Sequence, residues 1–331
     1  MLNNPSERMC GRAVALSALC LAMLFSGCAS WSKLSIRAVD EGTVNAVAFS
    51  PDGRLLASGG SGGEVKLFDA ESGELWRSWE AHDGGVDAIS FSPDGKLLAS
   101  ASDHTAKLWD ARTGELQQTL TEQPFLRDAT GIETLSFSPD GQTLASAGDK
   151  LILWDTRTGA MKQTLKEGNH VAAFAPDGRT LAAVTHLNLV GLWDAQAVEL
   201  KRELMHNEDK YVHVKSIAFS PDGRLLASAG TDNLIKLWDI EAGTVKLTLT
   251  AAKLDYGLQS VAISPDGKLV ASGNGNDETI KVWDAQTGEL KSTFRDNGWV
   301  TSIAFSPDGA TLASANNRSM VKLWDTSGLK K

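Results

Sequence analysis

Residues 216–239 read SIAFSPDGRLLASAGTDNLIKLWD, and most of the chain consists of variants of this stretch. Its apolar run, 217–219, is typical of a β-strand. Residues 220–223 follow as a turn, because the proline presets φ, the aspartate can bond its own backbone and the glycine accepts a positive φ. Residues 225–228 have the composition of a returning strand. The first half of the stretch therefore predicts an antiparallel hairpin.

A second turn and two further strands complete the repeated unit. Residues 231–233 form the turn, and residues 234–238 alternate apolar and polar side chains, as a strand with one buried face does. Residues 240–243 turn the chain once more into a fourth run, 245–249. Four short antiparallel strands in about 44 residues make one sheet. Such a sheet cannot bury both of its faces alone, so each unit must stack against its neighbours.

The unit occurs seven times along the chain. Its turn proline recurs at intervals of 37 to 46 residues, at Pro51, Pro93, Pro139, Pro176, Pro221, Pro265 and Pro307. An aromatic residue followed by aspartate ends the third strand of each unit, as Phe68-Asp69, Trp109-Asp110, Trp154-Asp155, Trp193-Asp194, Trp238-Asp239, Trp283-Asp284 and Trp324-Asp325. A period near 40–45 residues with four strands and a Trp-Asp pair indicates the blades of a β-propeller.

On these turns and aromatic–aspartate pairs, the chain resembles the WD40-repeat family over residues 33–331. The resemblance implies an all-β fold, a seven-bladed propeller of four-stranded antiparallel blades. Too few residues follow Asp325 to form a fourth strand in the last blade, whereas the strand-like residues 33–38 belong to no unit. We therefore expect this N-terminal strand to pair with the last blade and close the ring, which removes two free sheet edges. The alternative is a disordered N-terminal tail.

Residues 1–27 have the features of a signal peptide. Two arginines precede the apolar run 13–25, which is too short to cross a bilayer but has the length of a signal-peptide core. The sequence LFSGC that follows resembles the bacterial lipobox, although Phe25 stands where leucine, valine or isoleucine is usual. The resemblance implies that Cys28 is lipidated and becomes the N-terminus of the mature chain. A plain secretory signal is the alternative.

This interpretation divides the chain into a signal peptide (1–27), a lipidated cysteine with a short tether (28–32) and the propeller (33–331). Ala29 follows Cys28, and in lipoproteins of this kind the absence of aspartate there favours the outer membrane, facing the periplasm. A secreted or soluble periplasmic protein is the alternative.

The four residues between Cys28 and the propeller reach at most ~14 Å. The rim of the last blade is therefore expected to lie close to the bilayer, and the propeller to have a restricted orientation.

The net charge argues against a nucleic acid as the main partner. The chain carries 32 basic and 41 acidic residues; two arginines and one glutamate precede Cys28, which leaves 30 and 40, a net charge of −10. Binding to a phosphate backbone needs basic surface. The other two cysteines, Cys10 and Cys20, lie inside the signal peptide, so no intrachain disulfide is expected in the mature chain.

No catalytic residue, metal site or cofactor is expected. Residues 59–63, GGSGG, match the G-x-S-x-G pattern, but a nucleophile elbow needs a helix after the turn, and no helical period follows. The sequence has no phosphate-binding loop, no H-E-x-x-H and no C-x-x-C motif. Its six histidines are scattered, and only His82 and His104 share a blade closely enough to approach each other, which is a weak case for zinc.

The family resemblance gives His82 a structural role. In WD40 blades, a histidine before the first strand, a serine or threonine on the second, an aspartate in the next turn and the tryptophan on the third form a hydrogen-bonded relay. Blade 2 matches at His82, Ser100, Asp103 and Trp109, which would satisfy buried polar groups. Blades 5 and 6 are expected to keep the aspartate, as Asp232 and Asp277, without the histidine. The other blades lack the aspartate and carry Gly62, Gly148, Leu187 and Arg318 in its place.

Blade 4 is the least regular unit and is expected to be the weakest. Its first turn reads APDG instead of SPDG, and its third strand contains Gly191. Residues 196–198 lack the glycine that other blades have between their third and fourth strands.

The loops that break the repeat are the candidate binding sites. In the WD40 family, the usual binding face is made by the loops that join consecutive blades and by those between second and third strands. On that face the longest loop segments that depart from the repeat pattern are residues 121–131, 205–213 and 251–258. Aromatic residues and arginine are common interface anchors. The candidate partner-binding residues, in these loops and in the shorter loop of blade 7, are Phe125, Arg127, Tyr211, His213, Tyr256 and Trp299. The alternative for each is packing against a neighbouring loop.

Polar residues of mixed charge near the start of the first strands are expected to ring the mouth of a central channel. They are Asn45, Asp87, Glu133, Lys215, Gln259 and Thr301. Mixed charge favours a polar ligand or a peptide over a lipid.

Together these features favour a non-catalytic scaffold at the bacterial cell envelope, a monomeric propeller within a complex whose partner is another protein. One alternative is a propeller that binds a saccharide or small ligand at the channel mouth, favoured if Trp299, Tyr256 and Tyr211 face one cavity. A less favoured alternative is a hydrolase or lyase, which a perturbed acid pair such as Asp87 with Glu133 would support.

Overall fold

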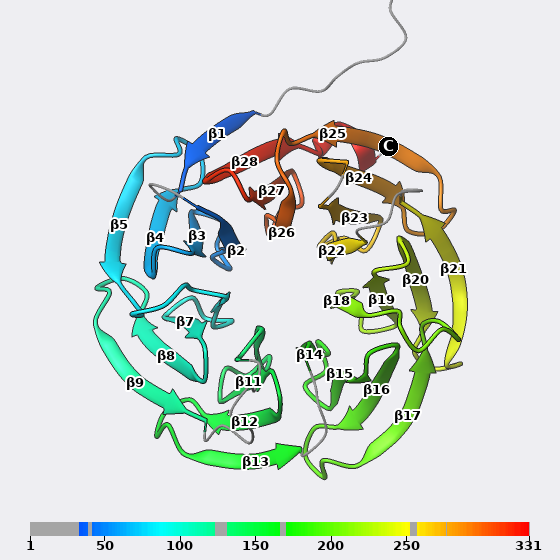
Figure 1. Ribbon diagram of the computed structural model, residues 1–331, viewed down its shortest axis with the longest axis horizontal. Coiled ribbons are helices and arrows are strands. Elements are labelled where there is room, and N and C mark those ends of the chain that lie inside the picture. Colours follow the sequence, from blue (N-terminus) through cyan, green and yellow to red (C-terminus); the bar gives the residue numbers. More distant parts are fainter. Residues whose placement is uncertain are drawn as a thin grey trace, which may run out of the picture.

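The computed structural model describes residues 33–38, 42–122, 131–165, 170–251, 257–275 and 277–330. In these residues, 28 strands form seven four-stranded sheets arranged as a ring around a central axis (Figure 1). The one helix described is a short 3-10 turn, η1 (Ser327–Lys330). The predicted seven-bladed propeller is confirmed. Four residues of the sequence-based site predictions, Cys28, Phe125, Arg127 and Tyr256, lie outside the described residues.

Each blade runs from an inner strand at the channel to an outer strand at the rim. Blade 1 contains β2 (Val44–Phe49), β3 (Leu55–Gly60), β4 (Glu64–Asp69) and β5 (Leu75–Glu80). Blade 2 contains β6 (Ala88–Phe91), β7 (Leu97–Ser102), β8 (Thr105–Asp110) and β9 (Leu116–Thr121). Blade 3 contains β10 (Thr134–Phe137), β11 (Thr143–Ala147), β12 (Leu151–Asp155) and β13 (Met161–Leu165). Blade 4 contains β14 (Ala172–Phe174), β15 (Thr180–His186), β16 (Leu189–Asp194) and β17 (Leu200–Met205).

The remaining blades follow the same order of antiparallel strands. Blade 5 contains β18 (Val214–Phe219), β19 (Leu225–Gly230), β20 (Leu234–Asp239) and β21 (Thr244–Thr250). Blade 6 contains β22 (Leu258–Ile263), β23 (Leu269–Asn274), β24 (Thr279–Asp284) and β25 (Leu290–Arg295). Blade 7 contains β26 (Val300–Phe305), β27 (Thr311–Asn316), β28 (Met320–Asp325) and, as its outer strand, β1 (Leu34–Arg37).

The N-terminal strand closes the ring, as predicted. β1 pairs antiparallel with β28, with Leu34 opposite Leu323 and Arg37 opposite Met320. The amide of Lys33 extends this ladder by donating to the Leu323 carbonyl at 2.6 Å. The first and last strands of the propeller therefore share one sheet (Figure 1), and β28 is paired on both sides instead of ending blade 7 as an unpaired edge strand.

The strand order defines two ends of the propeller. Because successive strands in a blade are antiparallel, the SPDG-type turns and the turns after the Trp-Asp pairs lie at one end, here called the turn face. The loops between second and third strands and the loops that join blades lie at the other end, here called the loop face. The candidate partner-binding residues that the structure describes, Tyr211, His213 and Trp299, all belong to loop-face segments.

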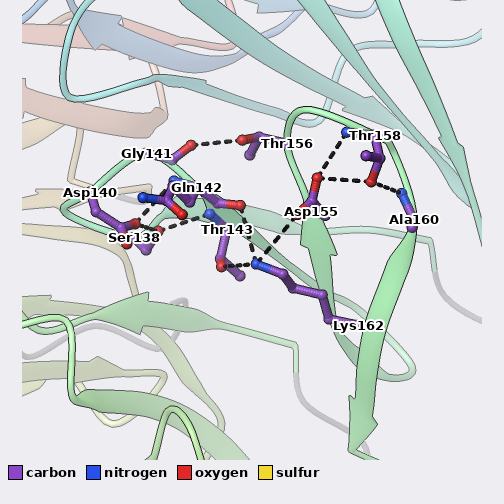
Figure 2. Close-up of polar contacts among 10 residues, drawn as sticks. All are labelled: Ser138, Asp140, Gly141, Gln142, Thr143, Asp155, Thr156, Thr158, Ala160 and Lys162. Atoms are coloured by element: carbon purple, nitrogen blue, oxygen red, sulfur yellow. Dashed lines mark hydrogen bonds and ion pairs between the residues drawn. The ribbon is translucent and has the colours of Figure 1, made fainter.

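The repeated turns are stabilised by their own polar side chains, as blade 3 shows (Figure 2). Ser138 donates its hydroxyl proton to Asp140, and Asp140 accepts the amide of Gln142 at 3.0 Å. In the next turn, Asp155 accepts both the amide and the hydroxyl of Thr158 at 2.8 Å. These donors hold the pKa of both aspartates below the usual range. Local chemistry of this kind explains why the turns could be predicted from sequence.

The apolar core is divided among the blade interfaces. Seven clusters of buried residues are found, and each joins side chains of two consecutive blades. Between blades 6 and 7, for example, Val282 and Phe294 pack with Val300, Leu312 and Trp324, and the rings of Phe294 and Trp324 stack with centroids 5.1 Å apart. Each sheet thus buries its faces against its neighbours, as expected for units that are not stable singly.

Blade 4 departs from the other blades where the sequence indicated. Its inner strand β14 is only 3 residues long. Val198 adopts a φ of 55° in the turn where blades 1, 2, 3, 5 and 6 place a glycine with positive φ.

No helix in the described part of the chain has the length and apolar character needed to cross a membrane.

Candidate functional site

A buried hydrogen-bonded chain supports the loop face at blade 2. His82 Nε2 lies 2.8 Å from Ser100 Oγ, and Trp109 Nε1 donates to the same oxygen at 2.9 Å. Ser100 Oγ therefore accepts the indole proton and is hydrogen-bonded to the imidazole at the same time. Burial and the Lys107 charge lower the pKa of His82 to about 4, so the imidazole is neutral near pH 7. The Asp103 charge opposes this lowering of the pKa.

Blade 5 contains the most complete chain of this type, contrary to expectation. His206 Nδ1 lies 2.7 Å from Ser228 Oγ, and Nε2 lies 3.2 Å from Asp232. Trp238 Nε1 donates to Ser228 at 2.9 Å. The prediction that blade 5 lacks the histidine is therefore wrong. The loop after His206 is longer than its counterpart in blade 2, so the histidine–serine separation is 22 residues in blade 5 and 18 in blade 2.

In blades 3 and 7 a buried carboxylate takes the place of the histidine. Glu122 accepts the Ser146 hydroxyl at 2.9 Å, and burial raises the pKa of Glu122. Asp296 accepts the Ser314 hydroxyl and lies 3.6 Å from the ammonium of Lys322. Sequence reasoning missed both acids. The signal was their position, one residue after the outer strands β9 and β25, which matches that of His206 after β17.

The channel mouth forms a cavity of about 320 Å³. Its lining includes all six of the polar residues expected there, which confirms that part of the prediction; they are Asn45, Asp87, Glu133, Lys215, Gln259 and Thr301. His170 occupies the corresponding place in blade 4, four residues before Phe174, as Lys215 precedes Phe219. Sequence reasoning missed His170, although it precedes Pro176 by six residues, as Lys215 precedes Pro221.

Acidic and basic side chains occupy two different, neighbouring arcs of the channel mouth. Asp87 and Glu133 come from blades 2 and 3, and burial together with the Asp103 charge raises the pKa of Asp87. His170 and Lys215 come from blades 4 and 5. Glu133 Oε1 lies 3.1 Å from His170 Nδ1, and this hydrogen bond raises the pKa of His170. The mouth therefore has an acidic arc and a basic arc, joined by one ion pair when His170 is protonated.

Two of the candidate anchor residues are exposed on the loop face. Tyr211, between β17 and β18, is 74% exposed, and Trp299, just before β26, is 49% exposed. Their backbones are held in place: the Tyr211 amide donates to Asp209 at 3.0 Å and the Trp299 amide donates to Asn317 at 2.9 Å. The Lys210 ammonium lies 5.2 Å from the Tyr211 ring centre. These loops thus present aromatic surface on a backbone that is already ordered.

His213 lies between the exposed loop and the channel. It is partly buried, its amide donates to Thr231 Oγ1 at 3.0 Å, and burial with the charge of Lys215 lowers the pKa of its imidazole. Tyr211 and Trp299 belong to blades 5 and 7, and neither is among the described residues that line the channel cavity. The structure therefore does not bring these two aromatic rings together in that cavity.

The geometry offers no group of metal ligands in the described residues, where no three histidine, cysteine, aspartate or glutamate side chains are close enough to share an ion. Residues 59–63 span the end of β3 and the loop that leads to β4. The Gly63 position allows only a glycine, because a Cβ there would lie 2.3 Å from the His82 carbonyl oxygen. The G-x-S-x-G match thus corresponds to close packing between blades 1 and 2.

Comparison with known families agrees with this architecture. The model of the WD domain, G-beta repeat, matches residues 73–110, 114–155, 200–239, 243–284 and 288–325. The model of the anaphase-promoting complex subunit 4 WD40 domain matches residues 29–86. Residues 156–199, which include β14, β15 and β16, lie between the matched segments. A search of curated proteins finds no significant match.

Proposed function

The chain belongs to the WD40-repeat family, and from this premise we propose that it is a non-catalytic platform that binds another protein through its loop face. Propellers of this family generally serve as protein-interaction scaffolds. The observation that carries the proposal is Tyr211, whose ring is 74% exposed while its amide is bonded to Asp209. An exposed aromatic side chain on an ordered loop can be buried by a partner at little further cost in ordering entropy.

The proposal includes a place in the cell. The apolar run 13–25 and the sequence LFSGC support a lipid anchor at Cys28, at the bacterial outer membrane facing the periplasm. A Cys28→Ala variant is expected to move from the detergent-extracted membrane fraction to the soluble fraction. A variant that stays in the membrane fraction would contradict the anchor.

The platform proposal is tested by crosslinking followed by purification through a C-terminal tag. We compare the unchanged protein with a Tyr211→Ala/Trp299→Ala variant. The control is Leu116→Ala/Leu290→Ala, because these two leucines are 48% and 50% exposed and begin outer strands at the turn face. We expect a near-stoichiometric envelope protein with the unchanged protein and the control, and its loss in the loop-face variant.

Each other outcome has a distinct meaning. A partner that is kept in the loop-face variant and lost in the control would leave a platform but contradict the binding face. Recovery of the propeller alone under all conditions would contradict the platform itself.

A second candidate function is recognition of a small charged ligand at the channel mouth. The cavity of about 320 Å³ with Asp87 and Glu133 on one side and Lys215 on the other favours it. A ligand carrying both charges would suit those arcs. Thermal shift measurements with a set of zwitterions and charged oligosaccharides, compared with a Lys215→Gln variant, test this candidate. Hydrolase or lyase activity is the least supported candidate, since Glu133 is already bonded to His170.

A further inference from the structure

Blades 1 to 6 share an irregularity at the start of the outer strand. In blade 1, Leu67 pairs with Arg77 and Phe68 with Leu75, so that Trp76 is an extra residue without a partner in the ladder. The same register shift occurs in blades 2 to 6. The extra residue in those blades is Gln117, Lys162, Lys201, Lys246 or Lys291. Only blade 1 carries an aromatic residue at this position.

The lysines at this position in blades 3, 4 and 6 pair with acids of the adjacent turn. Lys201 lies 2.7 Å from Asp194, and Lys291 lies 2.8 Å from Glu289. Lys162 lies 3.7 Å from Asp155, an ion pair that is drawn as a dashed line in Figure 2. Trp76 provides no charge for Asp69, the corresponding acid of blade 1. The substitution therefore leaves the turn without a cation and adds exposed apolar surface, which costs free energy unless a partner covers it.

The exposed surface of blade 1 has the chemistry of a membrane interface. Trp76 is 45% exposed and Leu75 is 54% exposed, and they are adjacent in the chain. The Arg77 guanidinium lies 5.4 Å from the Trp76 ring centre. Tryptophan is enriched at the level of lipid headgroups, because its ring is amphipathic, and arginine can keep its charge in water while its stem covers apolar surface.

This surface lies beside the strand that leads to the tether. β1 and β5 are neighbours at the rim (Figure 1). A Cβ on Gly73, in the turn before β5, would lie 2.4 Å from Leu34 Cδ2, so turn and strand are in contact. Lys33 and Glu71 line the same pocket. Trp76 follows Gly73 by three positions, or about 10 Å along an extended strand.

From this placement we propose that Trp76, with Leu75 and Arg77, contacts the phospholipid surface and orients the propeller on the bilayer. The inference rests on the proposed lipid anchor, because the four residues between Cys28 and Lys33 hold β1 within ~14 Å of the lipid. Glu71 and Glu74 are exposed beside the patch. Because these acids repel anionic headgroups, the surface recognised is the interface of zwitterionic phospholipids.

The proposal also fixes an orientation. Blade 1 faces the bilayer and blade 4, on the opposite side of the ring, faces away from it (Figure 1). Because Trp76 lies on the outer rim, contact through blade 1 does not cover the loop face with the bilayer. Tyr211 and Trp299 stay accessible to a partner in this arrangement.

The test uses the full chain in phosphatidylcholine vesicles and a single added thiol. All three cysteines of the sequence are at or before position 28, so a new cysteine in the processed, lipidated protein is the one free thiol. Glu74→Cys and Glu199→Cys place the same label one residue before the outer-strand leucine of blades 1 and 4 and leave Trp76 in place. We expect a blue-shifted label at position 74, quenched by bromolipid about threefold more strongly than the label at position 199.

A second pair of variants separates orientation from loss of folding. Glu74→Cys carries the label beside the patch, alone or together with Trp76→Lys, which introduces the residue that blades 3 to 6 have at this position. We expect flotation with the vesicles to be unchanged and bromolipid quenching at position 74 to fall when Trp76 is replaced. Unchanged quenching at position 74 would overturn the role of Trp76.

The remaining outcomes distinguish the anchor from the orientation. Failure of the unchanged protein to float with the vesicles would refute the lipid anchor. Flotation with equal quenching at positions 74 and 199 would refute only the oriented contact. A blue shift at position 74 that bromolipid does not quench, and that grows with the protein-to-lipid ratio, would assign the patch to a second copy of the chain.

Discussion

At the scale of single residues, the blades differ in one buried hydrogen bond, which joins a tryptophan indole to a serine hydroxyl. In blades 2, 3, 5 and 7, the indole Nε1 donates to a serine hydroxyl at 2.9 Å. Blade 1 has Phe68 in place of tryptophan, and Ser58 Oγ is buried without a partner. Blade 4 has Ala183 in place of serine, and Trp193 Nε1 is buried without a partner. An unsatisfied buried donor costs roughly 1–3 kcal/mol.

Restoring the acceptor in blade 4 is expected to stabilise the protein. In an Ala183→Ser variant, the new hydroxyl can accept the Trp193 Nε1 proton, which should add about 1 kcal/mol to the free energy of unfolding. Ser146→Ala, which removes the acceptor of Trp154 in blade 3, is the matched control and should lower the free energy of unfolding. Thermal unfolding followed by circular dichroism measures both. A fall in the melting temperature of Ala183→Ser would contradict this account.

Acid is expected to destabilise the fold partly through His82. Its folded pKa is about 4, whereas an unfolded histidine titrates near pH 6.5. The free energy of unfolding therefore keeps the full contribution of the neutral imidazole above about pH 6.5. As the pH falls from there towards 4, this free energy decreases by about 2 kcal/mol after allowance for solvent screening. In urea unfolding, the difference in free energy of unfolding between the unchanged protein and His82→Asn should shrink over this pH range. Parallel pH profiles would rule out His82 as the titrating group.

At the scale of elements, blade 4 combines several unfavourable local features. Besides the orphaned indole, its inner strand is short and Val198 takes a left-handed φ of 55°. A β-branched residue is poorly suited to that conformation. The corresponding position in other blades is a glycine, such as Gly243 with φ 69° and Gly288 with φ 76°. The prediction that blade 4 is the weakest blade has this physical basis.

A Val198→Gly variant is expected to raise stability by about 0.5–1 kcal/mol, because relief of backbone strain exceeds the added entropy of the unfolded glycine. Gly288→Val is the matched control, since it creates the same conflict in blade 6 and should be destabilising. Hydrogen exchange in β16 and β17 reports the local effect. If Val198→Gly exchanges faster there than the unchanged protein, the packing of the valine outweighs its strain.

At the scale of the whole molecule, ring closure joins the first and last blades of the propeller. Ile36 of β1 and Ala38, the residue after this strand, pack into the cluster that also contains Val44, Leu56 and Leu323. This cluster bridges blades 7 and 1, and the strand that completes it comes from the N-terminal side of the propeller. Stability of the closed ring is therefore expected to depend on a strand of 4 residues.

An Ile36→Asp variant tests this dependence. Ile36 is 7% exposed, so an aspartate there loses apolar burial and places a charge in the core, at a cost of about 3 kcal/mol. Ser78→Asp, on the exposed side of the outer strand β5, is the control and should change stability little. The melting temperatures of the two variants provide the comparison. Equal melting temperatures would mean that β1 is not needed to hold the ring closed.

Recognition at the loop face depends on contacts that the repeat does not encode. The six polar residues of the channel mouth could be predicted because each precedes its turn by a fixed number of residues. His170 has the same spacing to its turn, so the sequence held that signal as well. The chains completed by His206, Glu122 and Asp296 were not predicted, because these three side chains reach their serine partners across 18 to 24 residues of intervening sequence, and the loops between them vary in length.

The sequence by itself determined the number of blades, their strand order and the closing strand. Its turns and Trp-Asp pairs act within a few residues, so their chemistry can be identified from local pattern alone. Only the tertiary structure decided which side chain is hydrogen-bonded to each serine, how the charges divide around the channel and that the turn before β5 contacts β1. Those outcomes depend on contacts between neighbouring blades, where residues meet that are far apart in the chain and where a loop one residue longer or shorter changes the partner.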